Sequence, residues 1–141
     1  MSAKRNDAAV IGHVGIEVTN LAESKKFYQT MFNTLGFQVV MDDESAVGFS
    51  NGFFQVWLAK PQKARVERKS PVGEEFMVAD HLAILVQDRR TVDAVEEEMK
   101  KRGFEPLFPR EEHPQFSPGY YAVSFTDPDN YVVEVYTRPR T

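Results

Sequence analysis

Two histidines occupy matching positions in two similar stretches of the sequence. His13 lies near the start of Ile11–Val18 and His81 near the start of Ala79–Val86, and both stretches are short, apolar and rich in β-branched residues. The chain has no cysteine, so nitrogen and oxygen ligands must hold any metal. A histidine with only a structural role has no reason to recur in this way. Both imidazoles are therefore candidate metal ligands.

Two side chains with an oxygen donor recur in the same manner near the end of each half. Gln55 and Glu134 each follow an asparagine of a turn, Asn51 or Asn130, by four residues. Each half therefore offers one imidazole and one carbonyl or carboxylate oxygen. Such a mixed set suits Zn, Ni, Co, Mn or Fe(II), and a dication of this kind stabilises an enolate or enediolate beside a carbonyl.

The elements that must position these residues also repeat. Each half opens with a segment of strand length, after which Asn20 or Asp88 offers a helix N-cap. Both helices are predicted to end before a glycine, Gly36 or Gly103, because glycine often follows the last helical turn. A small antiparallel meander completes each half. The pattern predicts an α+β fold of two βαβββ modules.

The turns of the two meanders set the alignment of the halves. Asn51-Gly52 predicts a two-residue hairpin between strands at residues 46–50 and 53–59. The segment 127–130, Asp-Pro-Asp-Asn, occupies the same place in the second half, and asparagine tolerates the left-handed backbone that this turn requires. Aligning the halves at these turns sets Gln55 opposite Glu134.

The domain boundaries follow from the repeat and from composition. Residues 11–60 are predicted to form the first module and residues 79–138 the second. The charged segment 61–78, interrupted by proline and glycine, is interpreted as a linker, and the polar residues 1–10 as a disordered N-terminus. The two modules together are expected to form one domain.

A family resemblance follows from two motifs. The opening His-Val-Gly-Ile-Glu-Val-Thr-Asn at His13 and the ending Phe-Thr-Asp-Pro-Asp-Asn-Tyr-Val-Val-Glu-Val-Tyr at Tyr136 resemble the vicinal oxygen chelate superfamily of glyoxalases, bleomycin-resistance proteins and extradiol dioxygenases. The resemblance covers Ile11 to Tyr136, although the family usually has glycine where this chain has Asn130. It implies that the modules form a cupped, eight-stranded mixed sheet. It also implies a single divalent metal site, with four ligands: His13, Gln55, His81 and Glu134.

The resemblance allows three functions. The leading hypothesis is a metal-dependent lyase or isomerase of the glyoxalase type, with Glu134 and Glu17 as catalytic carboxylates, since the amide of Gln55 cannot act as a base. An extradiol dioxygenase would use Fe(II) on His13, His81 and Glu134. The third hypothesis is a metal-free small-molecule binding protein of the bleomycin-resistance kind. The presence of all four candidate ligands argues against it, because such a protein has no use for them.

Side-chain alternation along the strands predicts the substrate-binding wall. Gln55 shares a strand face with Phe53 and Trp57, and Glu134 shares one with Tyr136. His113 lies in the Pro-rich loop of the second half, and this loop could close over the site. Tyr120 and Tyr121 point to opposite faces of their strand, so only one of them can face the cavity. Tyr121 is assigned to this position. The predicted substrate-binding residues are Phe53, Trp57, His113, Tyr121 and Tyr136.

Charge and hydropathy restrict the partners. A net charge of −4 and a pI near 5.4 favour neither nucleic acid nor an anionic membrane. No apolar run approaches the ~18 residues of a membrane span, and no signal peptide is evident, so a cytoplasmic protein is expected. Two open sheets in so short a chain leave edges and apolar helix surface, which predicts a homodimer around a small-molecule substrate.

Overall fold

The computed structural model describes residues 11–61 and 81–139 of the chain. The N-terminus predicted to be disordered and nearly all of the predicted linker lie outside these ranges. Two helices and eight strands are described. They are β1 (His13–Glu17), α1 (Leu21–Thr34), β2 (Gln38–Asp42), β3 (Ala46–Ser50), β4 (Gln55–Ala59), β5 (His81–Leu85), α2 (Arg89–Lys101), β6 (Phe108–Glu112), β7 (Tyr121–Thr126) and β8 (Val132–Thr137).

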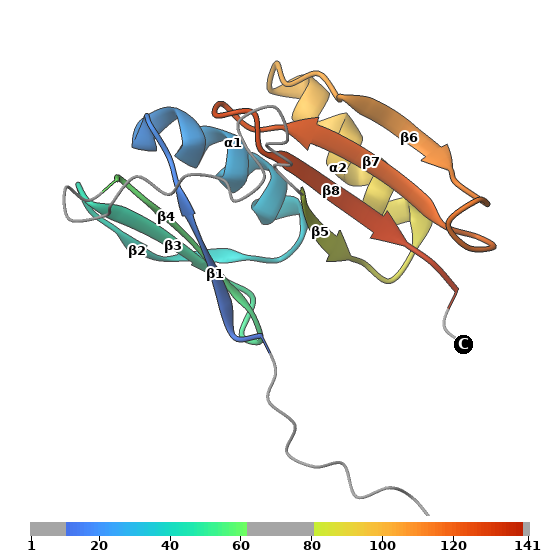
Figure 1. The fold of residues 1–141 in the computed structure, drawn as a ribbon, viewed down its shortest axis with the longest axis horizontal. Coiled ribbons are helices and arrows are strands. Elements are labelled where there is room, and N and C mark those ends of the chain that lie inside the picture. Colours follow the sequence, from blue (N-terminus) through green and yellow to red (C-terminus); the bar gives the residue numbers. More distant parts are fainter. Residues whose placement is uncertain (1–10, 62–80, 140–141) are drawn as a thin grey trace, which may run out of the picture.

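The strands form two mixed sheets with the same topology. The first has the order β1-β4-β3-β2 and the second the order β5-β8-β7-β6, each with four strands (Figure 1). In each sheet the opening strand pairs in parallel with the last strand, and the other pairs are antiparallel. This confirms the α+β fold of two βαβββ modules. Among the described residues the eight strands remain in two separate sheets.

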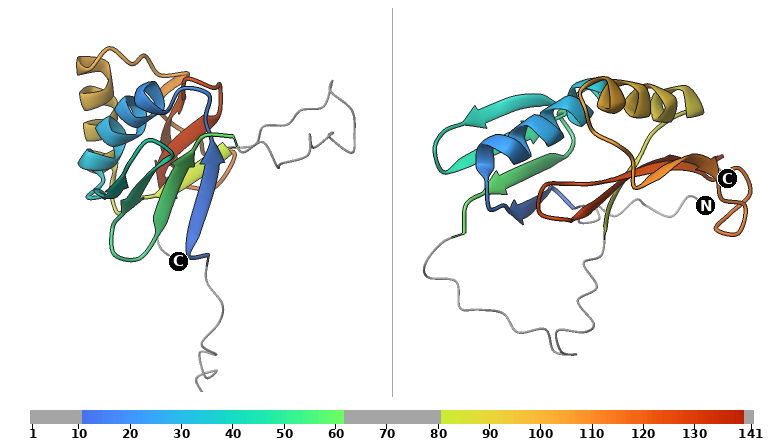
Figure 2. Two further views of the ribbon diagram at one scale, coloured as in Figure 1. Left: turned by 90° about the vertical axis from the view of Figure 1, so that its left-hand side faces the viewer. Right: turned by 90° about the horizontal axis from the view of Figure 1, so that it is seen from above.

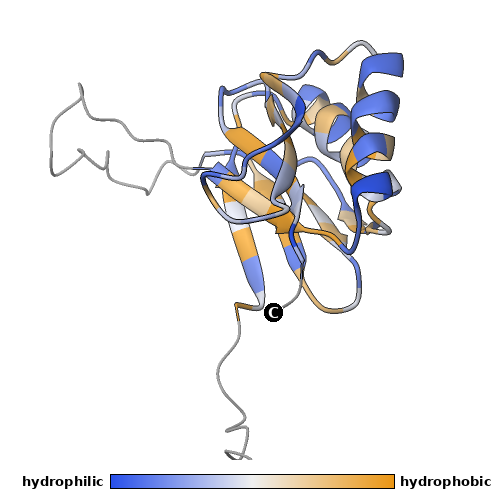
Figure 3. Cartoon of the chain, turned by 90° about the vertical axis from the view of Figure 1, so that its right-hand side faces the viewer, coloured by the Kyte–Doolittle hydropathy of each residue, from blue (hydrophilic) through white to orange (hydrophobic). Residues whose placement is uncertain are grey.

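The helices lie together on one side of the molecule, and both sheets lie on the other (Figure 2). Each sheet buries its apolar face beneath the helices, as the alternating burial of β4 and β8 shows. The outer faces of the helices are mostly hydrophilic (Figure 3). Side chains of both modules join one hydrophobic cluster, in which the ring centroids of Phe27 and Phe125 lie 6.5 Å apart. The two modules therefore share one core.

Both helices have the predicted ends. The Oδ1 atoms of Asn20 and Asp88 accept hydrogen bonds from the backbone N–H groups of Glu23 (3.1 Å) and Thr91 (2.9 Å). Hydrogen bonds from Thr91 lower the pKa of Asp88, because they favour its charged form. Gly36 and Gly103 follow the last turns with φ of 82° and 91°. These positive φ values explain why glycine occupies both positions.

The predicted two-residue hairpin is wrong in its length. Strand β4 begins only at Gln55, and Asn51 Oδ1 accepts hydrogen bonds from the N–H groups of Phe53 (2.9 Å) and Phe54 (2.8 Å), so residues 51–54 form the loop. Side-chain capping by Asn51 stabilises this longer loop. In the second module Asn130 has φ 69°, as predicted.

The predicted alignment of Gln55 with Glu134 is wrong by two residues. Gln55 is the first residue of β4 and pairs with His13, whereas the residue that pairs with His81 is Val132, the first residue of β8. Glu134 lies two residues further along β8 and pairs with Ala83 and Ser124. By strand register the counterpart of Gln55 is Val132, and that of Glu134 is Trp57. Counting from the turn failed because Asn51 directly follows β3, whereas Asn130 lies four residues after the end of β7.

A hydrogen bond connects the turn between β7 and β8 in the second module to helix α1 of the first. Tyr28 is fully buried, and its hydroxyl donates to Asp127 Oδ2 over 2.7 Å. Burial and the nearby Asp127 raise the pKa of Tyr28, so this hydroxyl remains a donor. The Thr19 hydroxyl donates to Asp129 Oδ1 over 2.5 Å. Two polar contacts thus accompany the apolar junction of the modules.

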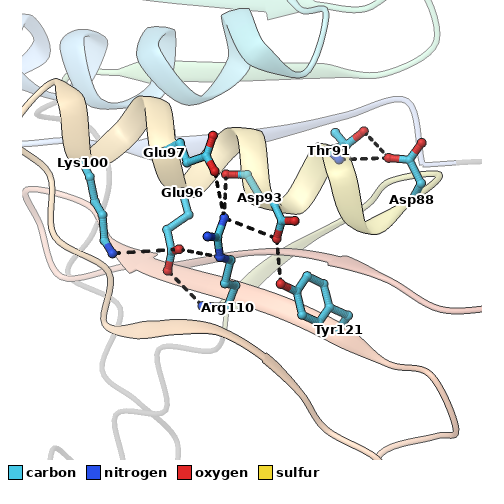
Figure 4. A network of polar contacts seen from close by, with 8 residues as sticks. All are labelled: Asp88, Thr91, Asp93, Glu96, Glu97, Lys100, Arg110 and Tyr121. Carbon is cyan, nitrogen blue, oxygen red and sulfur yellow. Dashed lines mark hydrogen bonds and ion pairs between the residues drawn. The ribbon is translucent and has the colours of Figure 1, made fainter.

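A cluster of ionic contacts anchors helix α2 to strand β6 (Figure 4). Glu96 is a buried acid, and its carboxylate accepts from the backbone N–H of Arg110 over 3.0 Å and lies 3.1 Å from the Nε of the same residue. The guanidinium also contacts Asp93 (3.4 Å) and Glu97 (3.2 Å). These carboxylates raise the pKa of Arg110. The network therefore neutralises a carboxylate that would otherwise be buried without a counter-charge.

Replacing Arg110 with methionine is expected to lower the free energy of unfolding by about 2 kcal/mol, because the buried Glu96 loses its guanidinium partner. Urea denaturation at fixed protein concentration measures the change. Arg102→Met is the matched control. Its ion pair with Glu98 is more exposed, so a loss below about 0.5 kcal/mol is expected. Equal losses in the two variants would contradict this role of Glu96.

None of the helices in the described part of the chain is long and apolar enough to cross a membrane.

Candidate metal centre

The first module holds one pair of the predicted ligands on neighbouring strands. His13 of β1 and Gln55 of β4 are direct partners in the parallel register. Both lie on the face opposite the buried Val56 and Leu58, which point into the core. His13 is exposed and Gln55 is half-buried. The predicted sharing of one open face by these two side chains is therefore confirmed.

Trp57 lies beside this pair and is held against the sheet. Its Nε1 donates to Gln55 Oε1 over 3.0 Å. The indole covers Gly48 of β3 so closely that a Cβ atom at that position would lie 2.6 Å from the ring. Only glycine allows the indole to lie flat there. Gly48 thus shapes the open face, although no pattern in the sequence marked it.

The second module holds the other pair. His81 of β5 pairs with Val132, while Glu134 of β8 pairs with Ala83, so the two candidate ligands lie on adjacent strands and on one face. Both line a cavity of about 360 Å³ in front of the second sheet. His113, in the loop before β7, lines the same cavity. Its ring stacks on Phe116 with centroids 5.3 Å apart.

Tyr120, not Tyr121, is the tyrosine on the ligand face. The Tyr120 hydroxyl donates to Glu134 Oε2 over 2.7 Å, and its ring stacks on Tyr136 at 4.8 Å. The Tyr121 hydroxyl instead donates to Asp93 of α2 over 2.6 Å, on the opposite side of the sheet (Figure 4). Burial and Glu134 raise the pKa of Tyr120, and burial with Asp93 raises that of Tyr121 to about 12.

Two other predicted site residues are Phe53, which lies in a loop, and Glu17, which lies at the end of its strand. Phe53 is 92% exposed in the loop before β4, because the strand begins two residues later than expected. Its ring is therefore not part of a cavity wall within one chain. Glu17 is half-buried at the end of β1 and lines a second cleft, of about 440 Å³, together with Gly15 and His81.

The four predicted ligands form two pairs rather than one cluster. In the ranges 11–61 and 81–139 no group of three His, Asp or Glu side chains is close enough to hold a metal ion. Each pair nevertheless combines an imidazole with an amide or carboxylate oxygen on an open sheet face. That donor chemistry fits half of the ligand set of a Zn, Ni, Co, Mn or Fe(II) ion.

The family model described as the Glyoxalase/Bleomycin resistance protein/Dioxygenase superfamily matches residues 10–135. The chain belongs to this superfamily. The match spans both modules, so the whole described fold, and not only its ending motif, carries the resemblance inferred from the sequence. Members of the superfamily commonly use divalent metals.

Individual relatives agree with this assignment. The YqjT protein of Bacillus subtilis (strain 168) is 26% identical over 125 residues, which cover 87% of this chain and 94% of that protein. The lactoylglutathione lyase of Agrobacterium tumefaciens superposes with a TM-score of 0.69 at 20% identity, covering 94% of this chain and 96% of that chain. The fosfomycin resistance protein FosX of Listeria monocytogenes superposes with a TM-score of 0.65 at 18% sequence identity, covering 94% of this chain and 95% of that chain. At these identities the two structures establish a shared fold.

Sequence reasoning missed two residues of the open face besides Gly48. Phe116 contacts His113 within the loop before β7, where the period of two gives no signal, and Tyr120, directly before that strand, donates to Glu134. The only available signal for Tyr120 was its spacing of two from Ala122 and four from Ser124, which share the face of Glu134.

Proposed function

We propose that this protein is a metal-dependent lyase or isomerase of the glyoxalase type, acting on a small substrate with two neighbouring oxygen atoms. The observation that carries the proposal is that each module places an imidazole and a side-chain oxygen on neighbouring strands of its open sheet face. His13 with Gln55, and His81 with Glu134, occupy matching strands and the open face of matching sheets. Two modules that had lost their chemistry would have no reason to keep this correspondence.

The complete site is proposed to form between two copies of the chain, with His13 and Gln55 from one copy and His81 and Glu134 from the other. Supporting this, the modules of one chain join through their helices, and among the described residues no strand of one sheet pairs with the other. Apolar side chains such as Phe108 (61% exposed) and Phe116 (62%) remain uncovered on the second module. A symmetric dimer would cover such surface and create two equivalent sites.

A divalent ion held by these four residues would supply positive charge beside the oxygen atoms of the substrate. The chain must supply the base. The amide of Gln55 cannot act as a base, whereas Glu17 is a carboxylate on the same face of β1 as His13, four residues further along the strand. We assign to Glu17 the removal of a proton from the carbon beside the carbonyl, and to Glu134 a ligand role that also adjusts the charge of the site.

The remainder of the proposed site is aromatic. Trp57 lies two residues beyond Gln55 and Tyr136 two residues beyond Glu134, each on the same strand face, and both are half-buried. Their rings would contact the part of the substrate that does not bind the metal. An apolar or planar substituent is therefore expected on the substrate.

A mixing experiment tests the shared site. His13→Ala and His81→Ala chains are refolded together in equal amounts, and bound Co²⁺ is measured. Half of the dimers then contain one chain of each kind, and each mixed dimer regains one intact set of ligands, so about a quarter of the wild-type sites should return. Proton exchange beside a carbonyl should return in the same proportion.

Other outcomes assign other functions. If wild-type protein binds Co²⁺ but mixing restores nothing, the ligands belong to one chain. If the Fe(II)-loaded protein consumes oxygen with catechols and catalyses no proton exchange, the dioxygenase alternative is correct. If wild-type protein takes up no divalent metal at neutral pH, the protein is better described as a small-molecule binding protein.

A further inference from the structure

We infer that Tyr120 is a positioning residue, whose hydroxyl holds one oxygen of the Glu134 carboxylate so that the other is presented to a bound divalent ion. This inference rests on the proposed function, because it assumes that Glu134 is a ligand. The contact itself is short and direct, since the hydroxyl donates to Oε2 over 2.7 Å. A hydrogen bond to a charged acceptor is stronger than one between neutral groups.

The backbone of Tyr120 is held on both sides. Its carbonyl accepts from His113 N over 2.8 Å, and its N–H donates to the carbonyl of Ser117 over 3.1 Å. The preceding Gly119 has φ 76°, and a Cβ atom there would lie 2.7 Å from the ring of Pro139. Only glycine fits this close approach of the loop to the end of the chain. Backbone contacts therefore fix the position of Tyr120 independently of its side chain.

The ring of Tyr120 is equally constrained. It stacks on Tyr136 with centroids 4.8 Å apart and an interplanar angle of 14°. The rings of Phe116 (5.3 Å) and His113 (6.3 Å) both meet it edge-on at 78°. Aromatic contacts of this kind restrict the ring without using its hydroxyl. Little conformational freedom is then lost when the hydroxyl binds Glu134.

This arrangement favours one orientation of the carboxylate. A glutamate on a strand rotates about three side-chain bonds, and an unrestrained carboxylate must lose that freedom when it binds a metal. The hydrogen bond from Tyr120 imposes that restriction in advance. Removal of a hydrogen-bond partner of a metal ligand typically weakens metal binding about 10–100-fold.

The test compares Tyr120→Phe with Tyr121→Phe. The two residues are adjacent, and each variant removes one tyrosine hydroxyl that donates to a carboxylate, on opposite faces of the sheet. Titration calorimetry with Co²⁺ should show affinity reduced about 10–100-fold in Tyr120→Phe and nearly unchanged in Tyr121→Phe. The visible absorption spectrum of bound Co²⁺ should change only in Tyr120→Phe. Thermal unfolding verifies that both variants are folded.

A double variant separates positioning from a general structural effect. If Tyr120 acts through Glu134, then Tyr120→Phe should cause no further loss of Co²⁺ affinity in a Glu134→Ala background. Unchanged affinity and spectrum in Tyr120→Phe, with wild-type protein binding Co²⁺, would overturn this inference and leave the proposed function intact. Absence of Co²⁺ binding by wild-type protein would overturn both.

Discussion

Replacing His81 with alanine is expected to weaken the binding of a divalent ion by at least about 100-fold, more than the loss of a partner that only orients a ligand. The imidazole is one of two nitrogen donors in the proposed set, and it lies on the same open face as Glu134. Without it, the pair in the second module is reduced to a single carboxylate. Titration calorimetry with Co²⁺ at constant pH measures the loss.

Gln55→Ala is the matched control within the same ligand set. An amide oxygen is a neutral donor that water can replace, so a loss of only about 10-fold is expected. Gln55→Glu should retain the metal and lower the positive charge of the site. A similar loss in His81→Ala and Gln55→Ala would contradict the assignment of the imidazole as the stronger ligand. Full affinity in His81→Ala would remove the residue from the site.

Replacing Asp127 with alanine is expected to lower the free energy of unfolding by about 3–5 kcal/mol. The side chain is only 3% exposed and accepts three hydrogen bonds, from the Tyr28 hydroxyl (2.7 Å) and from the N–H groups of Asp129 and Tyr131 (2.8 Å each). Alanine leaves the buried hydroxyl without its acceptor and frees the turn between β7 and β8. Urea denaturation monitored by circular dichroism provides the measurement.

Tyr28→Phe divides this effect into its two parts. It removes the contact between the modules but keeps both hydrogen bonds of Asp127 within the turn, so a loss of about 1–2 kcal/mol is expected. Protein concentration must be held constant, because formation of the proposed dimer would contribute to stability. If Tyr28→Phe were as destabilising as Asp127→Ala, the turn would contribute nothing and the contact with α1 would account for the whole effect.

The sequence by itself determined which side chains share a face of each sheet. Side chains alternate along a strand whatever the rest of the chain does, so His13 and Gln55 could be assigned to one face, and His81 and Glu134 to another. The helix ends could also be predicted from the sequence, because Asn20 and Asp88 cap their helices through contacts only three residues away. Local periodicity and local capping thus sufficed for the two modules.

Tertiary structure alone decided where those faces lie relative to each other. The modules are joined by contacts between residues far apart in sequence, such as Tyr28 and Asp127, which are separated by 99 positions. No local pattern predicts that helices rather than sheet edges would form this junction, and it is this junction that leaves the ligands in two pairs. The assignment of Tyr121 to the cavity failed for a related reason. Both adjacent tyrosines suit a strand, and only packing against Asp93 of α2 or against Glu134 distinguishes them.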